Sequence, residues 1–253
     1  MKSRITVSAL ALASALIAPQ LALAQSAPAP AAAPAPTPEH SFTYNVGLVT
    51  DYRYRGISQS GLNPALQGGV DYAHSSGFYL GAWASTITWL TDANLKGRLE
   101  VDLYGGYKGT AGPISYDVGL LQYWYPGNNA NPDANTLEVY GAGTYGAFTA
   151  KYSHSLTNLF GTANSKGSGY LDLSATFDLG NGWGVVPHIG RQRVANNGVF
   201  TYTDASVTVT KEAYGLVFSG MLVGTDTSKA VFTNANGKYL GKTAIVLGVK
   251  KNF

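Results

Sequence analysis

The sequence contains no cysteine and few charged residues. Of its 253 residues, 12% are Asp, Glu, Lys or Arg, which is about half the share that soluble globular domains carry. The absence of cysteine excludes disulfide scaffolds, cysteine-ligated metal sites and thiol nucleophiles. Beyond the N-terminus, no apolar run approaches the roughly 20 residues that a membrane-spanning helix needs. The chain therefore has fewer charged residues than a soluble domain usually has, yet it is not a polytopic helical membrane protein.

The first 24 residues have the three parts of a secretory signal peptide. Lys2 and Arg4 form the positive region, residues 5–17 form the apolar region, and Ala22-Leu23-Ala24 supplies the cleavage site. The apolar region is too short to span a membrane, and Pro19 ends it. Removal of this peptide lowers the formal net charge from +3 to +1. Nucleic-acid binding then has no electrostatic basis, and no nucleic-acid partner is predicted.

Residues 25–40 are almost entirely Ala and Pro. This composition is typical of an extended, semi-rigid linker. Following a signal peptide, it predicts a periplasmic spacer. The folded domain is then predicted to cover residues 41–253.

Alternation of apolar and polar residues, the period of a β-strand, runs through the whole folded domain. In the fourth strand, Leu99, Val101 and Leu103 alternate with Glu100 and Asp102. Most of the predicted strands are about as long as a tilted strand that crosses a bilayer. Twelve strands are predicted, at 42–54, 64–74, 78–89, 98–108, 114–125, 137–145, 148–155, 170–178, 183–193, 202–210, 214–223 and 243–253.

The connections alternate between short and long. Short ones fall near 75–77, 109–113, 146–147, 180–182 and 211–213, and longer ones include 126–136, 157–169 and 225–241. Outer-membrane barrels have short periplasmic turns and longer extracellular loops. We therefore predict an all-β fold, a transmembrane antiparallel up-and-down β-barrel of about 12 strands in the outer membrane of a Gram-negative cell. The even count places both termini in the periplasm, and a soluble β-sandwich is a distant alternative.

Tyrosine is abundant, with 17 residues. Tyr44 and Tyr52 share one predicted strand face and lie roughly 26 Å apart along the strand, near the spacing of the two aromatic girdles of a barrel. The rings are accordingly predicted to lie at the two membrane interfaces, although strands favour aromatic residues in any case. The chain ends on an alternating strand that closes with Phe253. This end resembles the C-terminal signal that the outer-membrane assembly machinery recognises, which implies that machinery and outer-membrane lipids as partners.

The first predicted hairpin contains the most specific motif of the chain, Val49-Thr50-Asp51-Tyr52-Arg53-Tyr54-Arg55-Gly56-Ile57-Ser58-Gln59-Ser60. Further motifs are 63–72, 76–79, 100–107, 115–120, 125–127 and Glu138. Together they resemble the TorF family of outer-membrane porins, although Thr50 stands where Ser is expected. The resemblance covers residues 41–253 and implies a single β-barrel through which small solutes diffuse passively.

Most charged residues fall on the polar strand face, which is the predicted lumen. Arg53 and Arg55 would set ion selectivity near the extracellular end, as charged rings do in pores. Alternatively, they pair with carboxylates and brace or plug the lumen. Bracing is favoured for any single residue, because both signs of charge are mixed and side chains can fill a small barrel. The predicted pore-lining residues are Asp51, Arg53, Arg55, Asp71, Arg98, Glu100, Asp102, Lys108, Asp117, Glu138, Lys151 and Asp172.

Two motifs that could indicate an enzyme lack the surroundings that such a site requires. Residues 141–146 match the pattern G-x-G-x-x-G, but a strand is predicted to follow where the phosphate-binding helix would begin. His154 could serve as the base of a membrane-embedded lipid hydrolase, but Ser153 and Ser155 point to the opposite strand face. His74 is predicted at an interface and His188 in the lumen, and no two histidines have metal-ligand spacing.

The predicted function is therefore a porin-like channel for passive diffusion of small polar or ionic solutes, with no cofactor, metal or catalytic residue. A closed structural or interaction barrel is the alternative, and a lipid hydrolase is a distant one.

Overall fold

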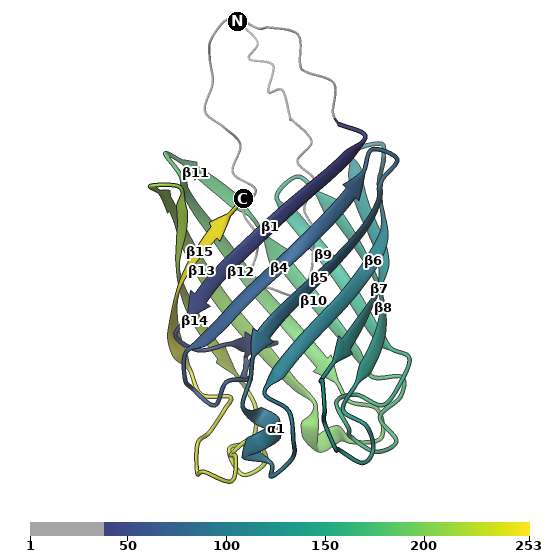
Figure 1. Ribbon diagram of the computed structural model, residues 1–253, viewed down its shortest axis with the longest axis vertical. Helices are drawn as coiled ribbons and strands as arrows, with labels where there is room; N and C mark the ends of the chain where they lie inside the picture. Colours follow the sequence, from purple (N-terminus) through teal and green to yellow (C-terminus); the bar gives the residue numbers. More distant parts are fainter. Residues whose placement is uncertain (1–37) are drawn as a thin grey trace, which may run out of the picture.

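The computed structural model describes residues 38–253. The predicted signal peptide and most of the predicted linker lie outside these residues. The described chain forms one antiparallel barrel (Figure 1). Its wall consists of β1 (His40–Val49), β4 (Ala65–His74), β5 (Phe78–Thr86), β6 (Leu99–Ala111), β7 (Ile114–Trp124), β8 (Thr136–Tyr145), β9 (Phe148–Ser155), β10 (Gly169–Ala175), β11 (Phe177–Gly180), β12 (Trp183–Arg193), β13 (Tyr202–Ala213), β14 (Leu216–Thr225) and β15 (Ala244–Asn252).

The wall is closed, because each strand pairs with its neighbours in the chain and β1 pairs with β15. At this seam, the Phe253 N–H donates to the Tyr44 carbonyl at 2.9 Å, and the Tyr44 N–H donates back at 3.3 Å. β10 and β11 are two halves of one wall strand, since both pair with β12 and only Thr176 separates them. The described wall thus contains twelve strands, which confirms the predicted closed antiparallel barrel.

The two ends of the barrel differ in their connections (Figure 1). At the terminal end, β1 begins, β15 ends, and short turns join the strands. At the opposite loop end lie the long connections, 50–64, 87–98, 125–135, 156–168, 194–201 and 226–243. Two short helices, α1 (Trp89–Asp92) and η1 (Gly198–Phe200), belong to these loops. The strand predicted to reach residue 89 therefore ends earlier, at Thr86, because Trp89 begins a helix.

The outer surface of the barrel wall is apolar. Outward positions such as Leu48, Leu80, Leu103, Leu222 and Leu247 are each about half exposed, while the residues between them face inward. No helix within residues 38–253 is long and apolar enough to cross a membrane.

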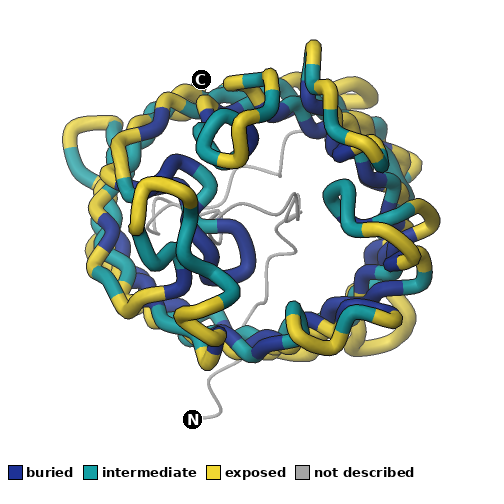
Figure 2. Tube along the Cα trace, turned by 90° about the horizontal axis from the view of Figure 1, so that it is seen from below, coloured by how far each residue is buried: buried dark blue, intermediate teal, exposed yellow. Residues whose placement is uncertain are grey.

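The prediction for the first strand is partly wrong. The wall strand ends at Val49, and the chain then folds into the barrel, where β2 (Arg53–Tyr54) pairs with β3 (Ile57–Ser58). Figure 2 shows buried chain inside the ring of strands. Tyr52 and Tyr54 are consequently buried, not placed on the outer face. Their phenol groups have hydrogen-bond partners inside the barrel, which an outer face in lipid would not supply.

The predicted aromatic girdles are also wrong for many of the tyrosines. Among the described residues, nine tyrosines are buried within the barrel: Tyr52, Tyr54, Tyr79, Tyr104, Tyr123, Tyr125, Tyr140, Tyr170 and Tyr202. Most of them belong to a cluster with Trp83, Ile87, Leu90 and Leu121. This cluster gives the barrel an aromatic core toward its loop end.

Candidate functional site in the barrel lumen

A hairpin formed by residues 51–60, here called the inward hairpin, crosses the lumen at the loop end. Its two strands, β2 and β3, are joined by Arg55 and Gly56, which have positive φ angles of 46° and 80°. Such a pair of angles is typical of a tight type I′ turn. A Cβ atom on Gly56 would lie only 2.6 Å from Thr225 Cγ2 and 2.7 Å from Asp204 Cβ. The tip of the hairpin therefore touches the wall at β13 and β14, and only glycine fits there.

Arg55 attaches the inward hairpin to the opposite side of the barrel. Its Nη2 lies 2.8 Å from Glu138 Oε2 on β8, and its Nη1 donates to Gln192 Oε1 on β12 at 2.6 Å. The guanidinium also lies over the ring of Tyr170 on β10, 4.3 Å from its centroid. Burial alone lowers the pKa of this guanidinium, but Glu138 and neighbouring tyrosines reverse the effect and leave the pKa of Arg55 raised. The buried pair is thus charged on the arginine side and braces the hairpin.

Arg53 attaches the same hairpin to the loop between β14 and β15. Its Nε donates to Asp51 Oδ2 at 2.6 Å, and its Nη1 donates to the carbonyls of Leu240 and Lys242 at 3.0 and 3.1 Å. Asp51 also accepts a hydrogen bond from the Ser58 hydroxyl at 2.6 Å. Both arginines are therefore engaged within the protein. These contacts favour the bracing interpretation over a ring that selects ions.

Tyrosine phenols tie the inward hairpin to the wall strands. Tyr52 and Tyr125 donate to the two oxygens of Glu100, at 2.5 and 2.7 Å. Tyr54 donates to the hydroxyl of Tyr123 at 3.0 Å. Burial and the nearby Glu100 raise the pKa of Tyr125, so its phenol stays a proton donor. A buried carboxylate needs such donors, and these bonds hold Glu100 in place beneath the hairpin.

Further toward the middle of the lumen, tyrosines bind two more carboxylates. Tyr104 donates to Asp71 Oδ1 at 2.5 Å. Tyr79 donates to Asp117 Oδ1 at 2.6 Å and also contacts the hydroxyl of Tyr140. These residues come from adjacent strands, β4 to β8, and they cover one side of the inner wall.

Charges in the middle of the lumen keep some contact with solvent. His188 lies 3.2 Å from Asp172 and 3.6 Å from Asp204. Lys108 lies 4.0 Å from Asp117. The Lys108 and Asp172 side chains are 20% and 25% exposed, compared with 1% and 2% for Arg55 and Glu138. The middle of the lumen is thus where a passing solute could meet charge.

The structure places most of the predicted pore-lining residues inside the barrel. Asp51, Arg53 and Arg55 belong to the inward hairpin. Arg98 differs, because it is exposed in the loop that precedes β6 and lies outside the wall strands. The others lie on the inner faces of strands: Asp71, Glu100, Asp102, Lys108, Asp117, Glu138, Lys151 and Asp172.

Sequence reasoning missed several inner residues. Asp204 is buried beside His188, and Lys250 shares its strand face with the buried Val246. Strict alternation along β13 and β15 could have identified both. Alternation also places Tyr104 and Tyr140 on the inner faces of their strands, with Glu100 and Glu138. Tyr52 and Tyr125 could not be found this way, because they lie beyond the ends of the wall strands.

Carboxylates outnumber lysines and arginines on the inner face. In the described part of the chain, eight carboxylates and five Lys or Arg side chains face the interior, whereas the sequence pattern predicts mixed signs without an excess. They are Asp51, Asp71, Glu100, Asp102, Asp117, Glu138, Asp172 and Asp204 against Arg53, Arg55, Lys108, Lys151 and Lys250.

A cavity of about 230 Å³ lies among the loops beside the inward hairpin. Its lining is mainly aromatic and aliphatic and includes Tyr54, Trp89, Phe160, Phe200 and Phe232. The Tyr54 and Phe160 rings meet edge to face with centroids 5.3 Å apart. A solute that approaches from the loop end would meet this apolar surface before the charged lumen.

The histidines lie where their strands place them. His154 is on the outer side of β9, where its Nδ1 is 3.5 Å from the Tyr152 hydroxyl. Ser153 and Ser155 are buried on the inner side, so neither can act with His154. The segment after the G-x-G-x-x-G match is β9, a strand. His40 lies directly opposite His74 across β1 and β4, a pairing that their spacing in the sequence does not indicate.

Known proteins match this chain at the level of family and fold. The model of a family described as bacterial protein of unknown function (Gcw_chp) matches residues 32–253. No curated protein sequence matches. A KdgM porin in complex with disordered oligogalacturonate has a TM-score of 0.52 at 9% identity, covering 84% of this chain and 98% of its own. A NanC porin has the same TM-score and identity, covering 83% and 98%.

At such low identity the two porins establish only the barrel fold. The family match does not test the resemblance to the TorF family, which stays a prediction.

Proposed function

The chain belongs to the Gcw_chp family of bacterial proteins of unknown function, and we propose that it is an outer-membrane channel through which small polar or ionic solutes diffuse passively. The observation that carries this proposal is a closed barrel with an apolar outer wall and a charged interior. Apolar residues on the outer face and charged residues on the inner face suit a wall that separates lipid from a polar lumen. The porins with the same fold support it.

The orientation follows from the two ends of the barrel. Bacterial outer-membrane barrels keep short turns in the periplasm and long loops outside the cell. The terminal end would accordingly face the periplasm, where the predicted linker enters, and the loop end would face outward. Phe253 would serve as the assembly signal, and outer-membrane lipids would surround the wall.

The channel is narrow at its outer end and weakly selective. The inward hairpin crosses the lumen there, so large solutes would be excluded. The excess of inner carboxylates over lysines and arginines favours cations. Because many of these charges are paired, the preference should be modest.

Planar-bilayer recording tests this proposal. The full mature chain is refolded from inclusion bodies, which contain no native porins, and its β-sheet content is verified first. We expect discrete conductance steps and a reversal potential in a KCl gradient that indicates a modest preference for K⁺. A folded protein that produces no conductance steps would overturn the proposal that it is a channel.

The second candidate is a closed structural or interaction barrel, and the inward hairpin is the observation that favours it. If the hairpin seals the lumen completely, the folded protein inserts into membranes without conducting. The same recording separates the two candidates, because a sealed barrel gives a flat baseline at every salt concentration.

A further inference from the structure

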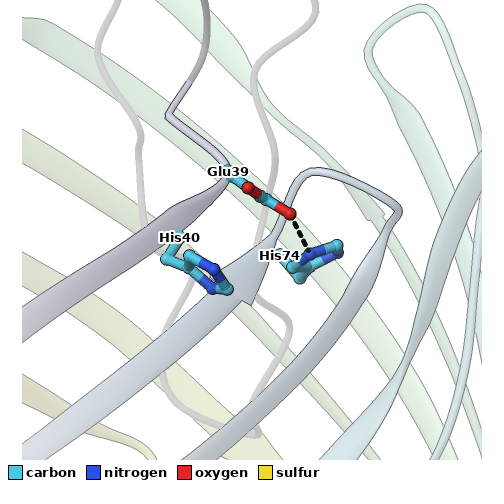
Figure 3. Close-up of side chains that lie close together, drawn as sticks. All are labelled: Glu39, His40 and His74. Carbon is cyan, nitrogen blue, oxygen red and sulfur yellow. Dashed lines mark ion pairs between the residues drawn. The ribbon is translucent and has the colours of Figure 1, made fainter.

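Three side chains of types that can bind metals lie close together at the terminal end of the barrel, outside the lumen (Figure 3). Glu39 and His40 stand at the start of β1, and His74 ends β4, where it pairs directly with His40. One ligand atom from each of the three residues lies within 4.8 Å of the other two. The Ser75 N–H donates to the Glu39 carbonyl at 2.9 Å, so the backbone holds the carboxylate beside the turn after β4.

One of the spacings between these atoms is close to that of a tetrahedral metal centre. Glu39 Oε1 lies 3.5 Å from His74 Nε2. Neighbouring ligand atoms in a tetrahedral zinc site with bonds of about 2.0–2.1 Å are separated by about 3.3–3.4 Å. The His40 and His74 rings are 5.2 Å apart at an angle of 61°, so their edges rather than their faces meet. Side-chain rotation would bring three ligand atoms that already lie within 4.8 Å of one another onto one ion.

The second nitrogen of each imidazole already has a partner. His40 Nδ1 lies 2.9 Å from the Tyr72 hydroxyl, and His74 Nδ1 lies 2.6 Å from the Ser76 hydroxyl. Metal-binding histidines usually donate the N–H of their outer nitrogen to such a partner, which fixes the ring and directs the other nitrogen at the metal. His74 Nδ1 also lies 3.1 Å from the backbone nitrogen of Ser76, whose N–H donates to it when the ring proton is on Nε2. In the tautomer with the proton on Nδ1, each ring donates to its hydroxyl partner, and Nε2 is the ligand atom.

We propose that Glu39, His40 and His74 bind a divalent transition-metal ion, with Zn²⁺ as the best fit. Two imidazoles and one carboxylate form a donor set that suits zinc, and a water molecule would complete the tetrahedron. Glu39 is 72% and His74 29% exposed in their side chains, so the ion can enter from solvent. Bound metal would clamp the chain that enters β1 to the β4–β5 turn, independently of any solute passage.

Zinc titration of the full mature chain, purified without a histidine tag and followed by calorimetry, tests the proposal. We expect one zinc ion per chain. His40→Ala and His74→Ala should each weaken binding at least a hundredfold, and Glu39→Gln should weaken it less. Tyr72→Phe should weaken it by about tenfold, as loss of a hydroxyl partner typically does.

His154→Ala is the matched control, because His154 also lies on the outer wall but outside the cluster, and it should leave binding unchanged. Zinc binding that survives both His40→Ala and His74→Ala would overturn the proposal. So would the absence of saturable binding in the folded wild-type protein.

Discussion

At the loop end of the barrel, the charged side chains of the inward hairpin and its partners are buried, whereas some of the paired charges in the middle of the lumen keep contact with solvent. Arg55 and Glu138 at the loop end are almost fully buried, and Lys108 and Asp172 in the middle remain a fifth to a quarter exposed. The two regions lie in one polar lumen and use the same residue types. From this difference we predict a role in stability for the buried charges and a role in selectivity for the partly exposed ones.

The loop end resembles the core of a soluble protein more than a pore. Its carboxylates receive hydrogen bonds from tyrosines and arginines, and its aromatic rings pack against the inward hairpin. Substitutions at the loop end should alter the stability of the fold and the width of the lumen. Substitutions in the middle of the lumen should alter ion selectivity.

Replacement of Arg55 should have the largest effect. Arg55→Leu leaves Glu138 buried without its cationic partner, and breaking such a pair costs about 3–5 kcal/mol. We expect the free energy of unfolding to fall by that amount, measured by urea denaturation in detergent micelles.

The double variant Arg55→Leu/Glu138→Leu is the matched control, because a buried ion pair replaced by apolar groups is often tolerated. It should recover most of the loss. A single variant as stable as the wild type would mean that the loop-end pair does not brace the hairpin.

Deletion of Phe253 should have the next largest effect, at the terminal end. It removes two main-chain hydrogen bonds at the seam with Tyr44 and the proposed assembly signal. We expect severalfold less protein in the outer-membrane fraction, measured by immunoblot after fractionation. Phe253→Tyr, which keeps an aromatic end, should preserve the yield, and an unchanged yield on deletion would refute the role of this residue.

The smallest effect should come from an isosteric change in the middle of the lumen, and the same kind of change at the loop end gives the direct comparison. Asp172→Asn removes a charge in the middle of the lumen and should reduce the preference for cations by a few millivolts of reversal potential, with little loss of stability. Glu138→Gln at the loop end should lower stability and leave selectivity unchanged. The reverse pattern would show that the two regions have been assigned the wrong roles.

The wall of the barrel could be predicted from sequence because alternation and turn residues are local signals. Ile245 and Leu247 on β15, for example, face outward as predicted. The inward hairpin could not be predicted in this way. Alternation continues through Tyr52 and Tyr54 after the chain has left the wall, and nothing in the sequence marks Arg55 as a residue with positive φ.

The partners across the lumen could not be predicted from the sequence either. Arg55 and Glu138 are 83 residues apart, and His40 and His74 meet only through the register of β1 and β4. The bracing interpretation of the arginines could nevertheless be favoured in advance, because both signs of charge are mixed on the polar strand faces and side chains can fill a small barrel.

Above all, the inward hairpin should narrow a conducting lumen at its loop end. A direct test replaces residues 51–60 by two glycines and compares single-channel conductance with the wild type, after both proteins are shown to be folded. Without the hairpin, water would solvate the carboxylates of Glu100 and Glu138. They would then not be buried without partners, so the barrel should still fold. We predict severalfold larger conductance steps for the deletion variant, and a folded variant with wild-type steps would contradict this role of the hairpin.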